Sequence, residues 1–181
     1  MLVRIYEENP NPKAIREVVD CLRQGGVIIY PTDTVYGIGC DINNRKAVER
    51  ICRIKGITPK KANFSFICSD LSNISFYTKP FGSSVYKTMR KNLPGPFTFI
   101  LQASNQVPKM LKNNRKNVGI RVPNSPIVTQ LVAGLENPLI STSNHSESLR
   151  STLECWRIVS GQFTQLSFFF ESSILDATVT K

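Results

Sequence analysis

The sequence predicts a single α/β domain built on a twisted, mostly open mixed sheet with flanking helices. Its 181 residues suit one domain. Hydrophobic residues make up 41% of the chain and charged residues 20%, so the chain can bury a core. Helical and strand patterns alternate along it, as they do in α/β folds. We expect the domain to span residues 1–181, with a divergent tail over residues 146–181.

Each predicted element is bounded by residues that typically start or stop it. Asn11, followed by proline, is typical of a helix start, and Gly25 of a helix stop. Ser125, also followed by proline, opens a later helix that we expect to end near Gly134. Helices are predicted where apolar residues recur on one face, over residues 15–22, 47–52, 85–93 and 127–132. Strands are predicted where apolar residues are continuous or alternate, over residues 27–30, 64–68, 97–103, 118–122 and 138–142.

Three further segments complete the chain. Residues 105–117 are polar and basic, which predicts a long mobile loop. Residues 149–159 carry apolar side chains at helical spacing and are interpreted as an amphipathic helix. Residues 166–170 are mostly apolar and are interpreted as a strand that has to pack against the sheet or against another subunit.

The composition excludes several classes of protein. The N-terminus is polar and acidic within its first residues, unlike a signal peptide, and no window approaches the ~18 apolar residues of a membrane span. The five cysteines are odd in number and scattered, and His145 is the single histidine, so we expect no metal site. The sequence therefore predicts a cytoplasmic protein with reduced thiols.

Positive charge is concentrated in the middle of the chain. The formal net charge is +10, and no acidic residue occurs between Leu71 and Leu135. The nine cations of this stretch are Lys79, Lys87, Arg90, Lys91, Lys109, Lys112, Arg115, Lys116 and Arg121. They indicate a polyanionic partner, such as RNA or a nucleotide triphosphate, or a basic region onto which acidic residues from elsewhere fold back. Both interpretations remain open.

Polar residues follow the first predicted buried strand. Residues 31–39, PTDTVYGIG, place threonine hydroxyls, a carboxylate and two glycines directly after the strand over residues 27–30. In α/β sheets, ligands bind at the carboxyl ends of strands. The same residues also suit a tight turn capped by Asp33 and the threonines, so a ligand site and a structural turn are both consistent with this motif.

Three other motifs carry candidate chemistry. Lys55, at the end of the second helix, can bind helix carbonyls or a phosphate. Arg121 lies in an apolar strand and needs a partner, which makes it a better candidate for phosphate or carboxylate binding than a surface lysine. The hydroxyl cluster over residues 141–143 binds phosphate oxygens or caps a helix.

Five motifs in this order, GGVIIYPTDTVYGIGCD, ICRIKG, NLPGPFTFIL, VGIRVP and PLISTS, resemble the YrdC/YciO family of threonylcarbamoyl-AMP synthase-like proteins. The resemblance covers residues 4–143 and resumes weakly at residues 172–176. It implies a YrdC/RibB-like fold around a positively charged cavity that binds ATP, with Mg²⁺, and L-threonine. It also implies a nucleotidyltransferase that uses bicarbonate in tRNA threonylcarbamoyl-adenosine biosynthesis, and double-stranded RNA as a partner.

Carried over by position, the resemblance implies roles for particular residues. The implied substrate-binding residues are Thr32, Thr34, Tyr36, Thr98 and Ser173. The implied nucleotide-binding residues are Lys55, Arg121, Ser141 and Ser143. No catalytic nucleophile and no metal ligand is implied, because this chemistry depends on positioning and charge neutralisation.

Two positions depart from the family pattern. Ile57 stands where the family's Lys-x-Arg motif has its arginine, and His145 stands where the Ser-x-Asn motif has its asparagine. These departures place the chain nearer the YciO-like branch. Three hypotheses follow. The first is a threonylcarbamoyl-AMP synthase-like enzyme, and the second is a YciO-like protein that binds nucleotide or double-stranded RNA with little or no synthase activity. The third is a structural or interaction protein that uses only the fold.

Overall fold

The computed structural model describes residues 2–72, 74–108, 111, 116–143, 157–160 and 174–175. The strands are β1 (Leu2–Arg4), β2 (Ile28–Tyr30), β3 (Gly37–Asp41), β4 (Ser65–Ile67), β5 (Thr98–Gln102), β6 (Asn117–Arg121), β7 (Leu139–Ser143), β8 (Arg157–Ser160) and β9 (Ile174–Leu175). The helices are α1 (Pro12–Arg23), α2 (Arg45–Ile54), α3 (Ile74–Tyr77), α4 (Ser83–Asn92) and α5 (Pro126–Leu135), with a 3-10 turn over Pro59–Lys61.

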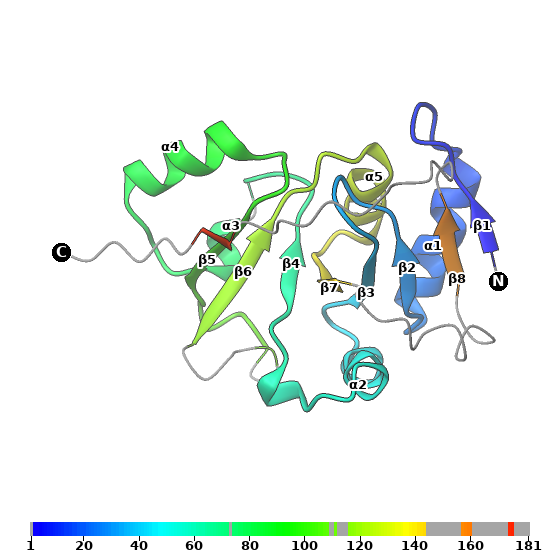
Figure 1. Cartoon of the computed structure of the whole chain (residues 1–181), viewed down its shortest axis with the longest axis horizontal. Coiled ribbons are helices and arrows are strands. Elements are labelled where there is room, and N and C mark those ends of the chain that lie inside the picture. The colour runs from blue at the N-terminus through cyan, green and yellow to red at the C-terminus, as the bar shows by residue number, and fades with distance from the viewer. Residues whose placement is uncertain are drawn as a thin grey trace.

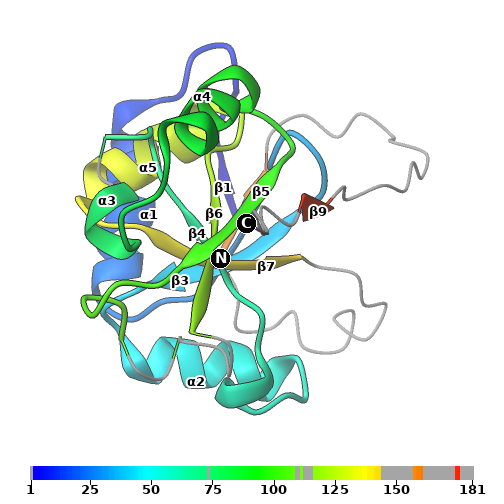
Figure 2. The same cartoon turned by 90° about the vertical axis from the view of Figure 1, so that its left-hand side faces the viewer.

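The described strands form one mixed sheet in the order β1-β8-β2-β3-β7-β4-β6-β5-β9 (Figure 1). β3 pairs antiparallel with β2 and β7, whereas β4 runs parallel to β6. β1 and β9 are the two edges, so the sheet is open. Helices α1 and α5 lie side by side (Figure 2), and α2 lies apart from them. The predicted α/β class, with an open mixed sheet and flanking helices, is confirmed.

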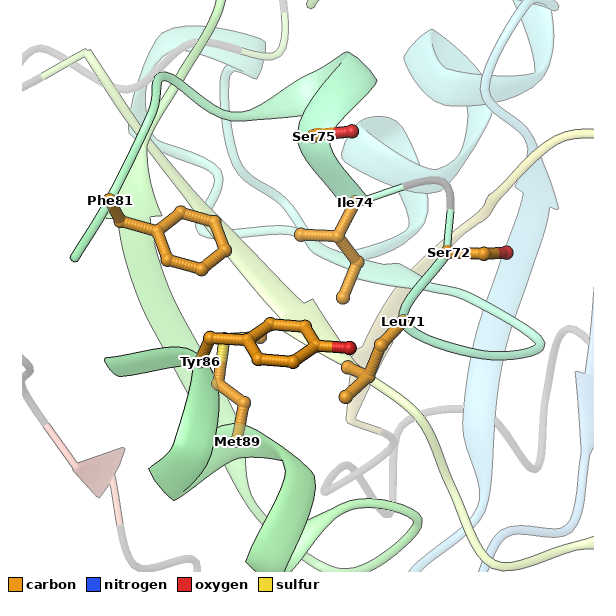
Figure 3. Close-up of a pocket in the computed structure, with 7 residues that line it drawn as sticks. All are labelled: Leu71, Ser72, Ile74, Ser75, Phe81, Tyr86 and Met89. Carbon is orange, nitrogen blue, oxygen red and sulfur yellow. The ribbon is translucent and has the colours of Figure 1, made fainter. Parts of the chain in front are cut away.

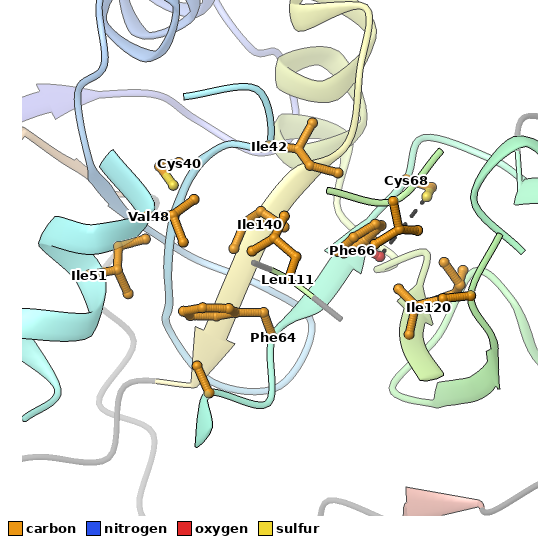
Figure 4. Close-up of a cluster of buried hydrophobic side chains, with 14 of the residues drawn as sticks. Cys40, Ile42, Val48, Ile51, Phe64, Phe66, Cys68, Leu111, Ile120 and Ile140 are labelled. Atoms are coloured by element: carbon orange, nitrogen blue, oxygen red, sulfur yellow. Dashed lines mark hydrogen bonds between the residues drawn. The ribbon is translucent and has the colours of Figure 1, made fainter. Parts of the chain in front are cut away.

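Buried side chains form two clusters, one on each face of the sheet. Successive strand residues point to opposite faces. Phe66 and Ile140 therefore belong to the cluster that packs against α2, shown in Figure 4. Their neighbours Ile67 and Leu139 belong to the cluster beneath α1 and α5. The two central strands β4 and β7 are thus buried on both faces, as their continuous apolar runs predict.

Side-chain caps start the helices where the sequence predicts. The Asn11 side chain accepts a hydrogen bond from the backbone N–H of Lys13 at 2.9 Å. α5 ends at Leu135, near Gly134 as predicted, and Glu136 follows it in the left-handed conformation, with φ 63°. Gly134 lies inside the helix, where a Cβ atom would be 3.1 Å from Val19 Cγ2 of α1, so it permits close packing of the two helices.

Three predictions about local structure are wrong. Residues 37–39, the end of the motif over residues 31–39, do not form part of a tight turn but begin the buried strand β3. Arg157–Ser160, predicted as the end of a helix, is the strand β8, which pairs with β1 and β2. Within the predicted mobile loop, Val107 and Leu111 are buried in the core at 1% and 7% exposure. Residues 166–170 and His145 lie outside the described residues.

Four cysteines lie in the described part of the chain, and none of them forms a disulfide there. Cys40, Cys52 and Cys68 are buried and Cys21 is half-buried. Burial raises the pKa of Cys68 to about 12, and it raises the pKa of Cys40 as well. No described helix is both long enough and apolar enough to cross a bilayer.

The buried thiols predict alkaline destabilisation. In the unfolded chain the Cys68 thiol ionises near its ordinary pKa of 9.0, whereas in the folded protein it stays protonated up to about 12. Its contribution to stability is therefore complete below pH 9 and is lost as pH rises from 9 to 12, at about 1.4 kcal/mol per pH unit for one proton. Chemical unfolding over this range is expected to show a shallower decline for Cys68→Ala than for wild type. An identical slope would contradict this prediction.

Candidate functional site

The β2–β3 loop, residues 31–36, reaches from β2 to the end of β6. Three strands, β3, β7 and β4, lie between β2 and β6 in the sheet. Even so, Arg121 Nη2 at the end of β6 donates to Asp33 Oδ1 at 2.5 Å and to Thr34 Oγ1 at 2.8 Å. The fold thus joins two predicted site residues, Thr34 and Arg121, that are 87 positions apart in the sequence.

Arg121 and Asp33 form an ion pair that is largely shielded from water. Their side chains are 14% and 13% exposed, although the Asp33 main chain is open to solvent. The predicted need of Arg121 for a partner is therefore met inside the protein, by a carboxylate from outside the acid-free stretch. Arg121 Nε is also buried, and it has no hydrogen-bond partner among the described residues. A buried N–H without an acceptor is uncommon, because the group loses its hydrogen bond to water and gains none in the protein.

The threonine hydroxyls shape the loop. Thr32 Oγ1 donates to the carbonyl of Val35 at 2.6 Å and accepts from the backbone N–H of Thr34 at 3.2 Å. The Thr32 and Thr34 hydroxyl oxygens are 3.2 Å apart. Thr32, one of the residues expected to cap a tight turn, therefore does so, whereas Asp33 contacts Arg121 instead.

The Tyr30 side chain, from the end of β2, packs against the glycines of β3. Its hydroxyl donates to Ser141 Oγ of β7 at 2.6 Å, and both residues are buried. Burial raises the pKa of Tyr30 well above its usual value, so the phenol remains protonated. A Cβ atom at Gly37 or Gly39 would lie 2.9 Å from the Tyr30 ring. The two glycines therefore make room for this buried tyrosine, and Ser141, predicted to bind nucleotide, accepts a hydrogen bond from within the protein.

Replacing Tyr30 with phenylalanine is expected to lower the free energy of unfolding by about 1–2 kcal/mol, because Ser141 loses its buried donor. Chemical denaturation measures this loss. Tyr86→Phe is the matched control, since Tyr86 is 45% exposed, and it is expected to change stability by less than ~0.5 kcal/mol. Equal losses in the two variants would contradict the account of the Tyr30 hydroxyl.

Small residues extend from Ser141 to β6 on the same face. Ser141 is paired with Ser65 of β4, and Ser65 is paired with Gly119 of β6. A Cβ atom at Gly119 would meet Thr98 Cγ2 at 3.1 Å and Ser65 Oγ at 3.3 Å. The predicted site residue Thr98 thus lies beside this row. Ser65 was not predicted to lie near the site. Its hydroxyl, in an otherwise apolar strand, could have indicated that this position faces polar neighbours.

The remaining predicted residues lie in several places. Tyr36 is in the β2–β3 loop at 37% exposure, and Lys55 is the C-cap of α2. Ile57, which stands in the place of the family's arginine, is 36% exposed. Ser143 is the last residue of β7 and pairs with Gly37. Ser173 lies outside the described residues.

A pocket of about 220 Å³ lies elsewhere, between α3, α4 and the chain before them (Figure 3). Its walls are mostly apolar and include Ile74, Phe81 and Met89. None of the predicted site residues lines it. Across the described residues, no group of three or more His, Cys, Asp or Glu side chains is arranged to hold a metal ion.

The sequence matches one protein-family model and is similar to several known proteins. The Sua5_yciO_yrdC family model, described as "Telomere recombination", matches residues 20–176. The uncharacterized protein YciO of Escherichia coli K12 is 43% identical over 141 residues, which cover 77% of this chain and 67% of that protein. A threonylcarbamoyl-AMP synthase of Coxiella burnetii is 37% identical over 135 residues, covering 75% of this chain and 72% of that protein.

Solved structures agree with this placement. The crystal structure of E. coli YciO matches with a TM-score of 0.81 at 37% identity, over 90% of this chain and 84% of that one. The crystal structure of P. abyssi Sua5 complexed with L-threonine matches with a TM-score of 0.84 over 98% of this chain and 54% of that one, and at 23% identity this shows the fold. The matched motifs and the shared fold together show that this chain belongs to the Sua5/YciO/YrdC family.

Proposed function

We propose that this chain binds ATP and L-threonine beside Arg121 and joins them, with bicarbonate, into threonylcarbamoyl-AMP for tRNA modification. The observation that carries the proposal is the cluster of Thr34, Asp33 and Arg121, in which a shielded guanidinium retains one buried N–H without an acceptor. A donor of this kind suits a carboxylate or phosphate oxygen. Relatives with the name threonylcarbamoyl-AMP synthase support the choice of substrates.

The proposed reaction needs no nucleophilic side chain. Bicarbonate takes up a proton and loses water to give carbon dioxide, and the neutral amine of threonine adds to it and releases a proton to form a carbamate. An oxygen of this carbamate then attacks the α-phosphorus of ATP. The bond from that phosphorus to the bridging oxygen breaks, and pyrophosphate leaves with the electron pair. The protein contributes orientation and positive charge, from Arg121 and Lys55, along the path of the anions. Mg²⁺ enters as part of the ATP complex, held by phosphate oxygens.

The second candidate is nucleotide or double-stranded RNA binding with little synthase activity. The apolar, partly exposed Ile57 favours it, because an isoleucine cannot replace a forked guanidinium at a triphosphate. Lys87, Arg90 and Lys91 on α4 also favour it, since they are exposed and form no ion pair among the described residues. RNA bound by these lysines and arginines would dissociate steeply as salt is raised.

Pyrophosphate release tests the two candidates. The purified protein is incubated with Mg-ATP, L-threonine and bicarbonate, and each component is omitted in turn. The synthase proposal expects pyrophosphate only in the complete mixture, and a gain in rate when Ile57 is replaced by arginine. Release that does not depend on threonine, or no release from either protein, would overturn it. In the second case, ATP and RNA binding in the same preparation would favour the alternative.

A further inference from the structure

Asp33 is the acidic residue of the β2–β3 loop, and both oxygens of its carboxylate are occupied. Oδ1 accepts from Arg121 Nη2, and Oδ2 accepts from the backbone N–H of Asn124 at 3.1 Å. Asn124 directly precedes Ser125, the N-cap of α5. One side chain therefore ties the β2–β3 loop both to the end of β6 and to the entry of α5.

This contact fixes the direction of the Arg121 guanidinium. The group is planar, so two acceptors on Nη2, Asp33 Oδ1 and Thr34 Oγ1, restrict the plane and the direction of the remaining N–H groups. With a side chain only 14% exposed, Arg121 has little space for another rotamer. Its Nε is left buried and without a partner among the described residues, which is unfavourable until an acceptor arrives.

We propose that Asp33 is a positioning residue, which holds Arg121 so that its unpartnered N–H meets an anionic oxygen of the substrate. The inference rests on the proposed function and adds to it a residue that acts through Arg121. Two substrate groups have this chemistry, the carboxylate of threonine and a phosphate of ATP. Separate titrations with L-threonine alone and with Mg-ATP alone identify which of the two depends on Asp33.

Asp33→Asn is the variant that tests the role with the least change of shape. An asparagine has one acceptor oxygen and one NH₂ group, so whichever way it turns, the NH₂ faces a donor, either Arg121 or the Asn124 N–H. Affinity for one of the two ligands is expected to fall about tenfold or more, because the guanidinium of Arg121 is no longer held in the direction that meets the anion. Asp33→Glu keeps the charge and both acceptors, and is expected to recover part of that loss.

Asp70→Asn is the matched control. Its carboxylate, in the loop after β4, also accepts hydrogen bonds on both oxygens: Oδ1 from the N–H and the hydroxyl of Ser72, and Oδ2 from the hydroxyl of Ser69. This control is expected to bind both ligands as wild type does. If Asp33→Asn binds like Asp70→Asn, Asp33 has no positioning role. If Asp33→Asn binds more tightly than wild type, the carboxylate competes with substrate for Arg121, and the proposal is again overturned.

A spectroscopic readout separates this inference from the proposed function. In protein labelled with ¹⁵N-arginine, the Nε–H resonance of Arg121 is assigned by its loss in Arg121→Lys. It is expected to shift or broaden in Asp33→Asn and to stay in place in Asp70→Asn, with no substrate present. An unmoved resonance would overturn the positioning role. Wild-type protein that binds neither ATP nor threonine would overturn the proposed function, while the resonance would still decide the role of Asp33.

Discussion

Replacing Arg121 with alanine is expected to reduce the affinity for the anionic substrate at least 100-fold and to lower the free energy of unfolding by about 2 kcal/mol. The affinity falls because the variant removes the cation of the site together with its unpartnered donor. Stability falls because Asp33, with a side chain only 13% exposed, is left as a charge without its partner. Isothermal titration and chemical denaturation measure the two effects.

Arg45→Ala is the control for this variant. Arg45 also pairs with a carboxylate, Glu49, at 2.8 Å, but its side chain is 79% exposed. An exposed pair at this helical spacing contributes only about 0.3–0.5 kcal/mol, and we expect no change in ligand binding. If Arg121→Ala bound both ligands as wild type does, Arg121 would have no place in the site.

Replacing Phe66 with alanine is expected to lower the free energy of unfolding by about 3–5 kcal/mol. Phe66 lies in β4 at the centre of the sheet, is fully buried, and meets the Tyr77 ring edge-on with centroids 5.7 Å apart. Truncation leaves a cavity that the rigid strands around it cannot fill. Thermal or chemical unfolding of the purified variant measures the loss.

Phe76→Ala separates burial from the ring contact in this experiment. Phe76 also meets Tyr77 edge-on, with centroids 5.0 Å apart, but is 55% exposed. Its truncation is expected to cost less than ~1 kcal/mol, because little apolar area leaves a buried environment. Losses of equal size in Phe66→Ala and Phe76→Ala would contradict the described core.

The spacing of apolar residues predicted the helices whose buried face is set by their own sequence. In α2, the four residues expected on the buried face, Ala47, Val48, Ile51 and Cys52, are the four that are buried. β3 was not predicted because glycine is depleted in strands, and the reason for Gly37 and Gly39 lies in the Tyr30 ring that packs over them. β8 was interpreted as helix because apolar spacing cannot reveal pairing with β1 and β2, which lie more than a hundred residues earlier.

In the candidate site too, local sequence predicted one feature, and contacts between distant residues could not be predicted. A charged residue in an apolar strand has to find a partner, and this predicted the importance of Arg121. The partner itself, Asp33, is 88 positions away and depends on the path of a loop across three strands. No periodicity or spacing encodes that path. The resemblance to the family implied Thr34 as a substrate-binding residue and Arg121 as a nucleotide-binding residue, and the fold then supplied the contact between the two.

The central claim is that one site beside Arg121 takes ATP and L-threonine together. Isothermal titration of Mg-ATP into the purified protein, with and without L-threonine, tests it most directly. The account predicts that ATP binds and that saturating threonine tightens its binding, because the two substrates lie against one another. If no ATP binds in either titration, the account is contradicted, and the anion that meets Arg121 is not a nucleotide.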